Sequence, residues 1–144
     1  MSMQDLYQQL IVDHSRSHTH RGQAEPCTHS QFGHNPLCGD SLEISLSVTD
    51  GLITEAKFTG EGCAISKASA SLMCEALQGL STTEAQELFE RFHALIMSEG
   101  QDDLGKLSAL ANVKSYPMRV KCATLSWHTM ISALNNSTEK VTTE

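Results

Sequence analysis

The stretch "SLEISLSVTDGLITEAKF", Ser41 to Phe58, decides the fold of this chain. Its first half has a period of two, with polar residues between apolar ones that would bury one face of a β-strand: Leu42, Ile44, Leu46 and Val48. Asp50-Gly51 ends this pattern, and Asp-Gly between two strand-like segments is a strong signal for a β-hairpin. The second strand is Leu52 to Phe58. We therefore expect an antiparallel sheet with one face packed against helices.

The residues just before the hairpin, "NPLCGD" from Asn35 to Asp40, form a turn that carries a cysteine and a carboxylate. Pro36 and Gly39 favour a turn for backbone reasons. In one interpretation this is an ordinary loop, in which Asp40 makes a local Asx-type hydrogen bond and Cys38 has no special role. In the other, Cys38 and Asp40 converge on a metal ion, because thiolate and carboxylate are both zinc ligands. Two ligands do not make a site, so two more are needed.

Two further cysteines lie where predicted elements meet. Cys63 follows Gly60 and Gly62, whose missing side chains permit a sharp exit from the second strand into a helix. Ser66 is the expected N-cap of that helix. Cys122 comes just before the apolar stripe of the last helix, so it should lie near the start of that helix. The ends of several elements can therefore bring these side chains together.

The rest of the chain supplies the other helices and one long polar segment. Apolar spacing predicts a first helix over Gln4 to His14, and "STTE" at Ser81 to Glu84 is a capping box that opens another. Ser15 to His34 is polar and rich in histidine, and we expect a long loop or an irregular edge strand there. We expect one domain over residues 1–134 and a frayed polar tail over residues 135–144.

Composition excludes several classes of protein. Lys plus Arg number 10 against 17 Asp plus Glu, which gives a net charge of −7 and opposes general nucleic-acid binding. The N-terminus has no apolar signal-peptide core, and no uncharged segment approaches the roughly 18 residues of a membrane span. Five cysteines is an odd number, and 144 residues can bury a core without disulfides. We therefore expect a cytoplasmic protein with reduced thiols and no membrane partner.

The side chains of Cys38, Asp40, Cys63 and Cys122 form the candidate metal site. Three thiolates and a carboxylate can complete a tetrahedral Zn²⁺ site or hold an iron–sulfur cluster with mixed ligands. The cysteines are 25 and 59 residues apart along the chain, unlike the compact pairs of zinc fingers. The spacing by itself thus leaves open both the existence of a shared site and the identity of its metal.

Four segments in order resemble a known family: "LYQQLIVDH", "NPLCGD", "GEGCAISKASASLM" and "RVKCATLSWHTMISAL". They are similar to the IscU/NifU-like proteins of iron–sulfur cluster assembly, specifically the SufU type. The resemblance covers nearly the whole chain and implies a single α+β domain, with a small antiparallel sheet packed against several helices. It also implies a site at the positions matched by Cys38, Asp40, Cys63 and Cys122.

Three details of the sequence bear on the type of relative. IscU-type proteins carry a histidine just before the last cysteine, where this chain has Lys121, and a Leu-Pro-Pro-Val-Lys motif, where it reads "LANVK". Both differences favour the SufU type, as does the length between Cys63 and Cys122. The chain departs from the family at "SHTHRG", Ser17 to Gly22, where relatives carry a Pro-Arg-Asn-like segment.

The resemblance implies a zinc-dependent sulfur acceptor, with Cys38 taking persulfide sulfur from a SufS-type cysteine desulfurase and passing it to a downstream iron–sulfur scaffold or apo-protein. The alternative is a scaffold on which an iron–sulfur cluster is built. Arg119 and Lys121 are candidates for charge compensation or partner docking, and we assign Arg119 to the catalytic group with Cys38. Cys27 and Cys74 match no site motif, so we expect an exposed free thiol and a packing residue, respectively.

Overall fold

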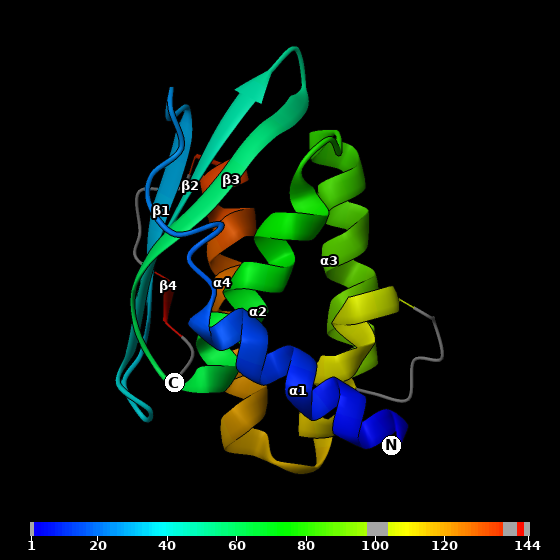
Figure 1. The fold of residues 1–144 in the computed structure, drawn as a ribbon. Coiled ribbons are helices and arrows are strands. Elements are labelled where there is room, and N and C mark those ends of the chain that lie inside the picture. Colours follow the sequence, from blue (N-terminus) through cyan, green and yellow to red (C-terminus); the bar gives the residue numbers. More distant parts are fainter. Residues whose placement is uncertain (1, 98–103, 137–140, 143–144) are drawn as a thin grey trace.

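The computed structural model describes residues 2–97, 104–136 and 141–142, which form a sheet with helices on one of its faces (Figure 1). The elements in chain order are α1 (Met3–Arg16), β1 (His29–Asn35), β2 (Asp40–Thr49), β3 (Leu52–Glu61), α2 (Ala64–Leu77), α3 (Thr82–Met97), η1 (Gly105–Ser115, a 3₁₀ helix), α4 (Pro117–Leu134) and β4 (Val141–Thr142). The strand order is β3-β2-β1-β4, with β1, β2 and β3 antiparallel. The predicted α+β class, a small antiparallel sheet packed against helices, is confirmed.

The hairpin predicted around Asp50 and Gly51 is present as β2 and β3. Thr49 pairs with Leu52, and the two residues between them have φ values of 53° and 78°. Positive φ at both central residues is what a two-residue hairpin turn requires, because its twist then matches that of the strands. Alternate side chains of β2 enter the core and are at most 2% exposed: Leu42, Ile44 and Leu46.

The segment from Ser15 to His34, where we expected a long loop or an irregular edge strand, ends in a regular strand that is paired on both sides. β1 pairs with β2 from His29 to Asn35 and with β4 on its other side. The residues of β1 that face α4 are Gln31, Gly33 and Asn35, and none of them has a large apolar side chain. At Gly33 an added Cβ would collide with Thr129, so α4 lies directly against the strand. Contact with the backbone of β1, rather than burial of large apolar side chains, therefore places this strand.

Part of the C-terminal tail also belongs to the sheet. Helix α4 ends at Leu134, and the structure describes residues 135–136 and 141–142 of the segment that we expected to be frayed. Val141 and Thr142 form β4, which pairs in parallel with Gly33 and His34. This short strand covers the outer edge of β1. The division into a domain and a tail at residue 135 stays a prediction.

The helix boundaries follow local capping signals. α1 begins after Ser2, whose hydroxyl accepts a hydrogen bond from the Asp5 N–H at 3.1 Å. The predicted capping box before α3 is present, because the Glu84 N–H donates to the Ser81 hydroxyl at 3.0 Å and the carboxylate accepts from the Ser81 N–H at 2.9 Å. The N-cap of α2 is Cys63 rather than Ser66, so this helix begins immediately after the strand exit.

The core lies between the sheet and helices α2 and α4 and continues to α3 and η1, while α1 packs against α2 and η1. The Phe92 ring of α3 stacks on the Trp127 ring of α4 with centroids 4.3 Å apart, and the indole N–H donates to Ser69 in α2. The largest fully buried side chains are Trp127, Phe58, Phe92, Leu42, Ile44, Leu46, Ile53, Leu72, Met73, Leu77, Ile96 and Leu110. Within the described ranges, no helix is long and apolar enough to cross a membrane.

Candidate metal centre

The loop of the β1–β2 hairpin carries the first candidate ligand. Asn35 pairs with Asp40 across the hairpin, so the loop is residues 36–39. Gly39 has φ 71°, a left-handed conformation that glycine adopts without a steric penalty. Cys38 is partly exposed on this loop, whereas Asp40, the first residue of β2, is fully buried. An accessible thiol and a buried carboxylate thus stand side by side.

Cys38 and Asp40 meet Cys122, which enters from the second turn of α4. The two Sγ atoms and a carboxylate oxygen all lie within 4.8 Å of one another. The Cys38 and Cys122 Sγ atoms are 3.1 Å apart, and neither cysteine is in a disulfide. Sulfurs that share a tetrahedral zinc at 2.3 Å lie about 3.8 Å apart, so a metal would need only a small separation of the two thiols. The donor set therefore fits Zn²⁺ in both chemistry and spacing.

Cys63 stands beside these three ligands, at the exit of β3. As the N-cap of α2 it follows the end of β3, and its backbone N–H donates to Asp40 Oδ1 at 2.9 Å. Its thiol is outside the group of three ligand atoms but is close enough to Cys122 to interact with that thiol. Of the four predicted ligands, three therefore converge and the fourth stands beside them.

Burial and neighbouring side chains together raise the pKa of the Cys122 thiol. Its side chain is 1% exposed, and burial is the main cause that raises the pKa of this thiol well above its usual value. Contacts with Cys38, Asp40 and Cys63 raise the pKa further. Without a metal, Cys122 therefore stays a neutral thiol at physiological pH. A bound metal ion would reverse this, because a coordinating cysteine is deprotonated outright.

The glycines of the strand exit leave room for the carboxylate. A Cβ on Gly62 would lie 2.7 Å from Asp40 Oδ1, closer than non-bonded atoms approach. Gly60 has φ 129°, and a Cβ there would collide with the Ser41 carbonyl oxygen across the β2–β3 ladder. The motif "GEGC" thus lets β3 pass close to β2 while the Asp40 carboxylate occupies the space beside Gly62.

Asn35 is a buried neighbour of the site to which the sequence analysis gave no role. Its side chain is fully buried and contacts both Asp40 and Cys122. Asn35 makes the Asx-type hydrogen bond of this loop, which one interpretation had assigned to Asp40, because the Asn35 Oδ1 accepts from the Leu37 N–H. Its position at the start of the "NPLCGD" motif was the available signal.

Arg119 and Lys121 precede Cys122 in α4, and they line two different hollows. The Arg119 guanidinium is 5.0 Å from the centre of the Tyr116 ring, a cation–π arrangement. Arg119 also lines a pocket of about 380 Å³ with Ile65, which follows Cys63 by two residues. Lys121 lines a separate hollow that includes Pro117 and Val120. The catalytic assignment of Arg119 stays a prediction.

The other cysteines lie in different surroundings. Cys27 is exposed, and its Sγ is 3.6 Å from the His29 carbonyl oxygen. Cys74 is fully buried in the core, and burial raises the pKa of its thiol. The positions of Cys27 and Cys74 match the expected free thiol and packing residue.

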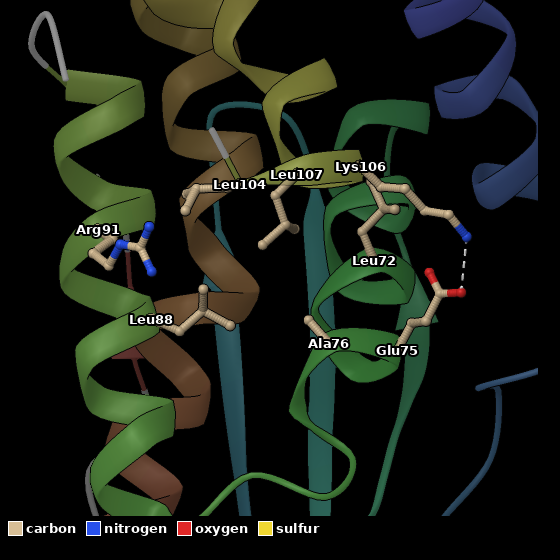
Figure 2. A pocket seen from close by; sticks show the side chains of 8 residues that line it. All are labelled: Leu72, Glu75, Ala76, Leu88, Arg91, Leu104, Lys106 and Leu107. Atoms are coloured by element: carbon tan, nitrogen blue, oxygen red, sulfur yellow. Dashed lines mark hydrogen bonds and ion pairs between the residues drawn. The ribbon is translucent and has the colours of Figure 1, made fainter. Parts of the chain in front are cut away.

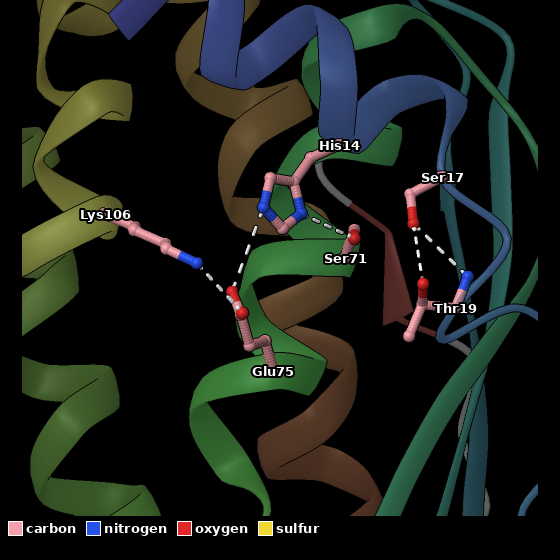
Figure 3. A network of polar contacts seen from close by, with 6 residues as sticks. All are labelled: His14, Ser17, Thr19, Ser71, Glu75 and Lys106. Carbon is pink, nitrogen blue, oxygen red and sulfur yellow. Dashed lines mark hydrogen bonds and ion pairs between the residues drawn. The ribbon is translucent and has the colours of Figure 1, made fainter.

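The histidines of the N-terminal segment do not form a metal cluster within the described ranges. His14 instead joins α1 to α2, with its Nδ1 2.8 Å from the Ser71 hydroxyl and its Nε2 3.8 Å from Glu75 (Figure 3). Lys106 of η1 completes this network through an ion pair of 3.0 Å with the same glutamate. These contacts hold three elements together and lie apart from the candidate ligands.

A larger pocket of about 450 Å³ lies among α2, α3 and η1 (Figure 2). Apolar side chains point into it, and charged groups stand at its margin: Leu72, Glu75, Ala76, Leu88, Arg91, Leu104, Lys106 and Leu107. None of the candidate ligands lines this pocket.

Comparison with known proteins places the chain in a family. Residues 6–123 match the family described as NifU-like N terminal domain. The chain is 38% identical over 131 residues to the iron–sulfur cluster assembly scaffold protein IscU of Thermotoga maritima, covering 90% of this chain and 92% of the relative. It is 36% identical over 129 residues to the zinc-dependent sulfurtransferase SufU of Bacillus subtilis, with 88% and 87% covered.

Solved structures agree with the sequence relatives. A crystal structure from Fervidobacterium islandicum, described as an iron–sulfur cluster assembly scaffold protein for the SUF system, aligns with a TM-score of 0.83 at 33% identity, covering 92% of this chain and 99% of that one. A NifU-like N-terminal domain from Brucella abortus shares the fold at 20% identity and a TM-score of 0.80. The chain therefore belongs to the NifU-like N-terminal domain family, the IscU and SufU proteins of iron–sulfur cluster assembly.

Proposed function

We propose that this protein is a zinc-dependent sulfur acceptor in iron–sulfur cluster assembly. The observation that carries the proposal is the convergence of a partly exposed thiol, Cys38, with the buried Asp40 and Cys122, whose ligand atoms lie within 4.8 Å of one another. Cys63, beside them, would supply the fourth ligand of a closed tetrahedral site. The similarity to a protein named as a zinc-dependent sulfurtransferase supports the same function.

The proposed role of zinc is to keep the cysteines ready for reaction. A free thiol with a pKa near 8.5 is only about 3% ionised at pH 7, whereas a zinc-bound thiol is a thiolate. Cys38 is the ligand best placed to move, because it lies on a four-residue loop while Cys122 is held in a packed helix. The thiolate that reacts is therefore expected at Cys38.

The proposed reaction is a transfer of one sulfur atom between two cysteines. The Cys38 thiolate attacks the outer sulfur of a persulfide on a SufS-type cysteine desulfurase. A sulfur–sulfur bond forms at Cys38, the one on the donor breaks, and the donor cysteine leaves as a thiolate. Charge and oxidation state balance without another reactant. The sulfur would then pass to an iron–sulfur scaffold or an apo-protein.

Charge around the site bears on the proposed docking role of Arg119 and Lys121. Three thiolates, one carboxylate and Zn²⁺ sum to a formal charge of −2, which is costly to bury unless cations stand close. The Arg119 guanidinium lies over the Tyr116 ring, and the side chain lines the same pocket as Ile65. We therefore expect Arg119 to meet an acidic group of the partner at the edge of that pocket.

The second candidate function is a scaffold for an iron–sulfur cluster, which the relative named IscU supports. Lys121 weighs against it, because a protonated amine has no lone pair to offer iron. Anaerobic purification followed by metal and sulfide analysis separates the two functions. The proposal expects a colourless protein with about one zinc per chain. A brown protein with stoichiometric iron and acid-labile sulfide would establish the scaffold instead.

A functional assay tests the role of each cysteine. Cys38→Ala should abolish the stimulation of a partner desulfurase, because it removes the accepting sulfur. Cys27→Ala and Cys74→Ala are matched controls that remove a cysteine outside the cluster, and both should still stimulate the desulfurase. Full stimulation by the Cys38→Ala variant would refute the assignment.

A further inference from the structure

Asn35 connects three parts of the candidate metal centre through one buried side chain. It is the last residue of β1, and its amide is fully buried. Its Oδ1 accepts a hydrogen bond from the Leu37 N–H at 3.3 Å. Its Nδ2 donates to Asp40 Oδ2 at 3.4 Å and approaches Cys122 Sγ at 3.6 Å. One side chain thus contacts the loop that carries Cys38 and two of the candidate ligands.

The chemistry of these partners fixes the orientation of the amide. A backbone N–H can only donate, so the oxygen of Asn35 must face Leu37. The NH₂ group then faces Asp40 and Cys122. A carboxylate and a thiolate accept hydrogen bonds without donating any, so both amide protons find partners when the ligands are ionised. The reverse orientation would bury unsatisfied groups at both ends, at a cost of about 1–3 kcal/mol for each.

The hydrogen bonds are distributed unequally among the ligands. Asp40 accepts at both oxygens, from the Cys63 N–H at 2.9 Å and from Asn35. Cys122 accepts from the same amide. In the described structure, the Cys38 Sγ accepts a hydrogen bond from the Cys122 thiol. The proton of that thiol is lost when both sulfurs bind a metal. Among the three convergent ligands, Cys38 would then be the one without a fixed donor in the described structure, whereas Cys63 is fixed through its backbone N–H.

We propose that Asn35 is a positioning residue that holds Asp40 and Cys122 on the metal and so leaves Cys38 as the ligand that departs. This inference rests on the proposed function, because it assumes a zinc site. A hydrogen bond to a thiolate stabilises its charge and lowers its nucleophilicity, so the amide would also direct sulfur transfer away from Cys122. The selectivity for Cys38 is then determined by a residue that is neither a ligand nor a nucleophile.

The first test measures zinc affinity by competition with a chromophoric chelator. Asn35→Ala should raise the Kd for zinc by about 10- to 100-fold, the usual effect of losing a partner that orients a ligand. Asn35→Ser keeps an oxygen that can accept from the Leu37 N–H, but one hydroxyl proton on a shorter side chain replaces the two amide protons that face Asp40 and Cys122, so this variant should weaken zinc binding similarly. An Asn35→Ser variant with wild-type zinc affinity would show that only the hydrogen bond to the Leu37 N–H matters, and it would overturn the inference.

A double-mutant cycle distinguishes the positioning of the ligands by Asn35 from a general destabilisation of the metal site. The effect of Asn35→Ala should persist in Cys38→Ser, where both of its acceptors remain, and should shrink in Asp40→Ala, where one is gone. The Co²⁺ absorption spectrum of Asn35→Ala should also shift, because the amide no longer polarises the Cys122 thiolate. Equal effects in the two backgrounds, or an unchanged Co²⁺ spectrum, would contradict the proposal.

Gln31 provides the matched control. It is a buried amide on the same face of β1, and it donates to the Ser132 hydroxyl at 3.2 Å rather than to the metal centre. Gln31→Ala should leave the zinc Kd within about twofold of the wild type, and an effect as large as that of Asn35→Ala would overturn the inference. A wild-type protein that binds no zinc would refute the proposed function itself, whereas zinc binding that is insensitive to Asn35 refutes only this inference.

Discussion

Replacing Gly62 by alanine tests whether the carboxylate of Asp40 is held where a metal needs it. The new Cβ would stand 2.7 Å from Asp40 Oδ1, whereas ordinary contact begins at 3.4 Å. One of the two groups must therefore move by about 0.7 Å. Asp40 has little freedom to do so, because it is fully buried and held by the Cys63 N–H and by Asn35.

A displacement of this size is large for a metal ligand. Zinc–oxygen distances in proteins stay within about 0.2 Å of their preferred value, so a shift of about 0.7 Å removes the carboxylate from the coordination sphere or distorts the site. We expect Gly62→Ala to bind zinc at least about tenfold more weakly, comparable to the loss of a supporting contact. Chelator competition measures the Kd, and the spectrum of the Co²⁺ form reports the ligand geometry.

Gly79→Ala is the control for destabilisation without damage to the site. Gly79 lies just past the end of α2 with φ 89°, and a Cβ added there would have no neighbouring atom within 4 Å. Alanine at this position therefore costs roughly 1–2 kcal/mol of backbone strain and contacts nothing. This variant should unfold more easily yet bind zinc normally. A Gly62→Ala protein with wild-type zinc affinity and an unchanged Co²⁺ spectrum would refute the assignment of Asp40 as a ligand.

Three further predictions concern the ligands, the core and pH. Cys63→Ser and Cys122→Ser should each lose zinc, which metal analysis would show, and retained zinc would exclude that cysteine as a ligand. Calorimetry should show a Tm lower by roughly 2–4 °C for every 1 kcal/mol of binding free energy lost. Trp127→Ala should cost about 3–5 kcal/mol in urea unfolding, because the indole is fully buried; a loss below about 1 kcal/mol would contradict the packing. Burial lowers the pKa of His14 below 6.5, so the unfolded chain binds the proton more readily and stability should fall as pH drops through 6.5. His14→Asn should flatten this dependence in unfolding curves measured between about pH 5 and pH 8, and an unchanged slope would refute the role of His14.

Much of the fold was predictable because its signals are local. The Asp50-Gly51 turn needs two residues with positive φ, and the strands beside it alternate cleanly. The capping box at Ser81 involves residues only three positions apart. Such features depend on neighbours in the chain, so the sequence contains nearly all the information that specifies them.

The strands β1 and β4 could not be predicted in this way. The inward side of β1 contains Gln31, Gly33 and Asn35, so the apolar alternation that identifies a half-buried strand is absent. The strand is placed by long-range contacts, chiefly the close approach of Gly33 to α4. β4 has two residues and no pattern of its own, and it is identified only by its pairing with β1.

The candidate site was identified by its residue types but not by its geometry. The chemistry of Cys38 and Asp40 indicated a metal, yet no local rule brings Cys122 to within 4.8 Å of residues more than 80 positions away. The family resemblance supplied that association. The contacts of Asn35 became visible only in three dimensions, since the partners of a buried amide depend on how helix α4 lies on the sheet.

Locating the transferred sulfur tests directly whether Cys38 is the sulfur acceptor. The zinc-loaded protein is incubated with a SufS-type desulfurase and cysteine, the persulfides are trapped by alkylation, and each of the five cysteines is examined by mass spectrometry. We expect a persulfide on Cys38, because that thiol is partly exposed on its loop. A persulfide found only on Cys27, Cys63 or Cys122 would contradict it.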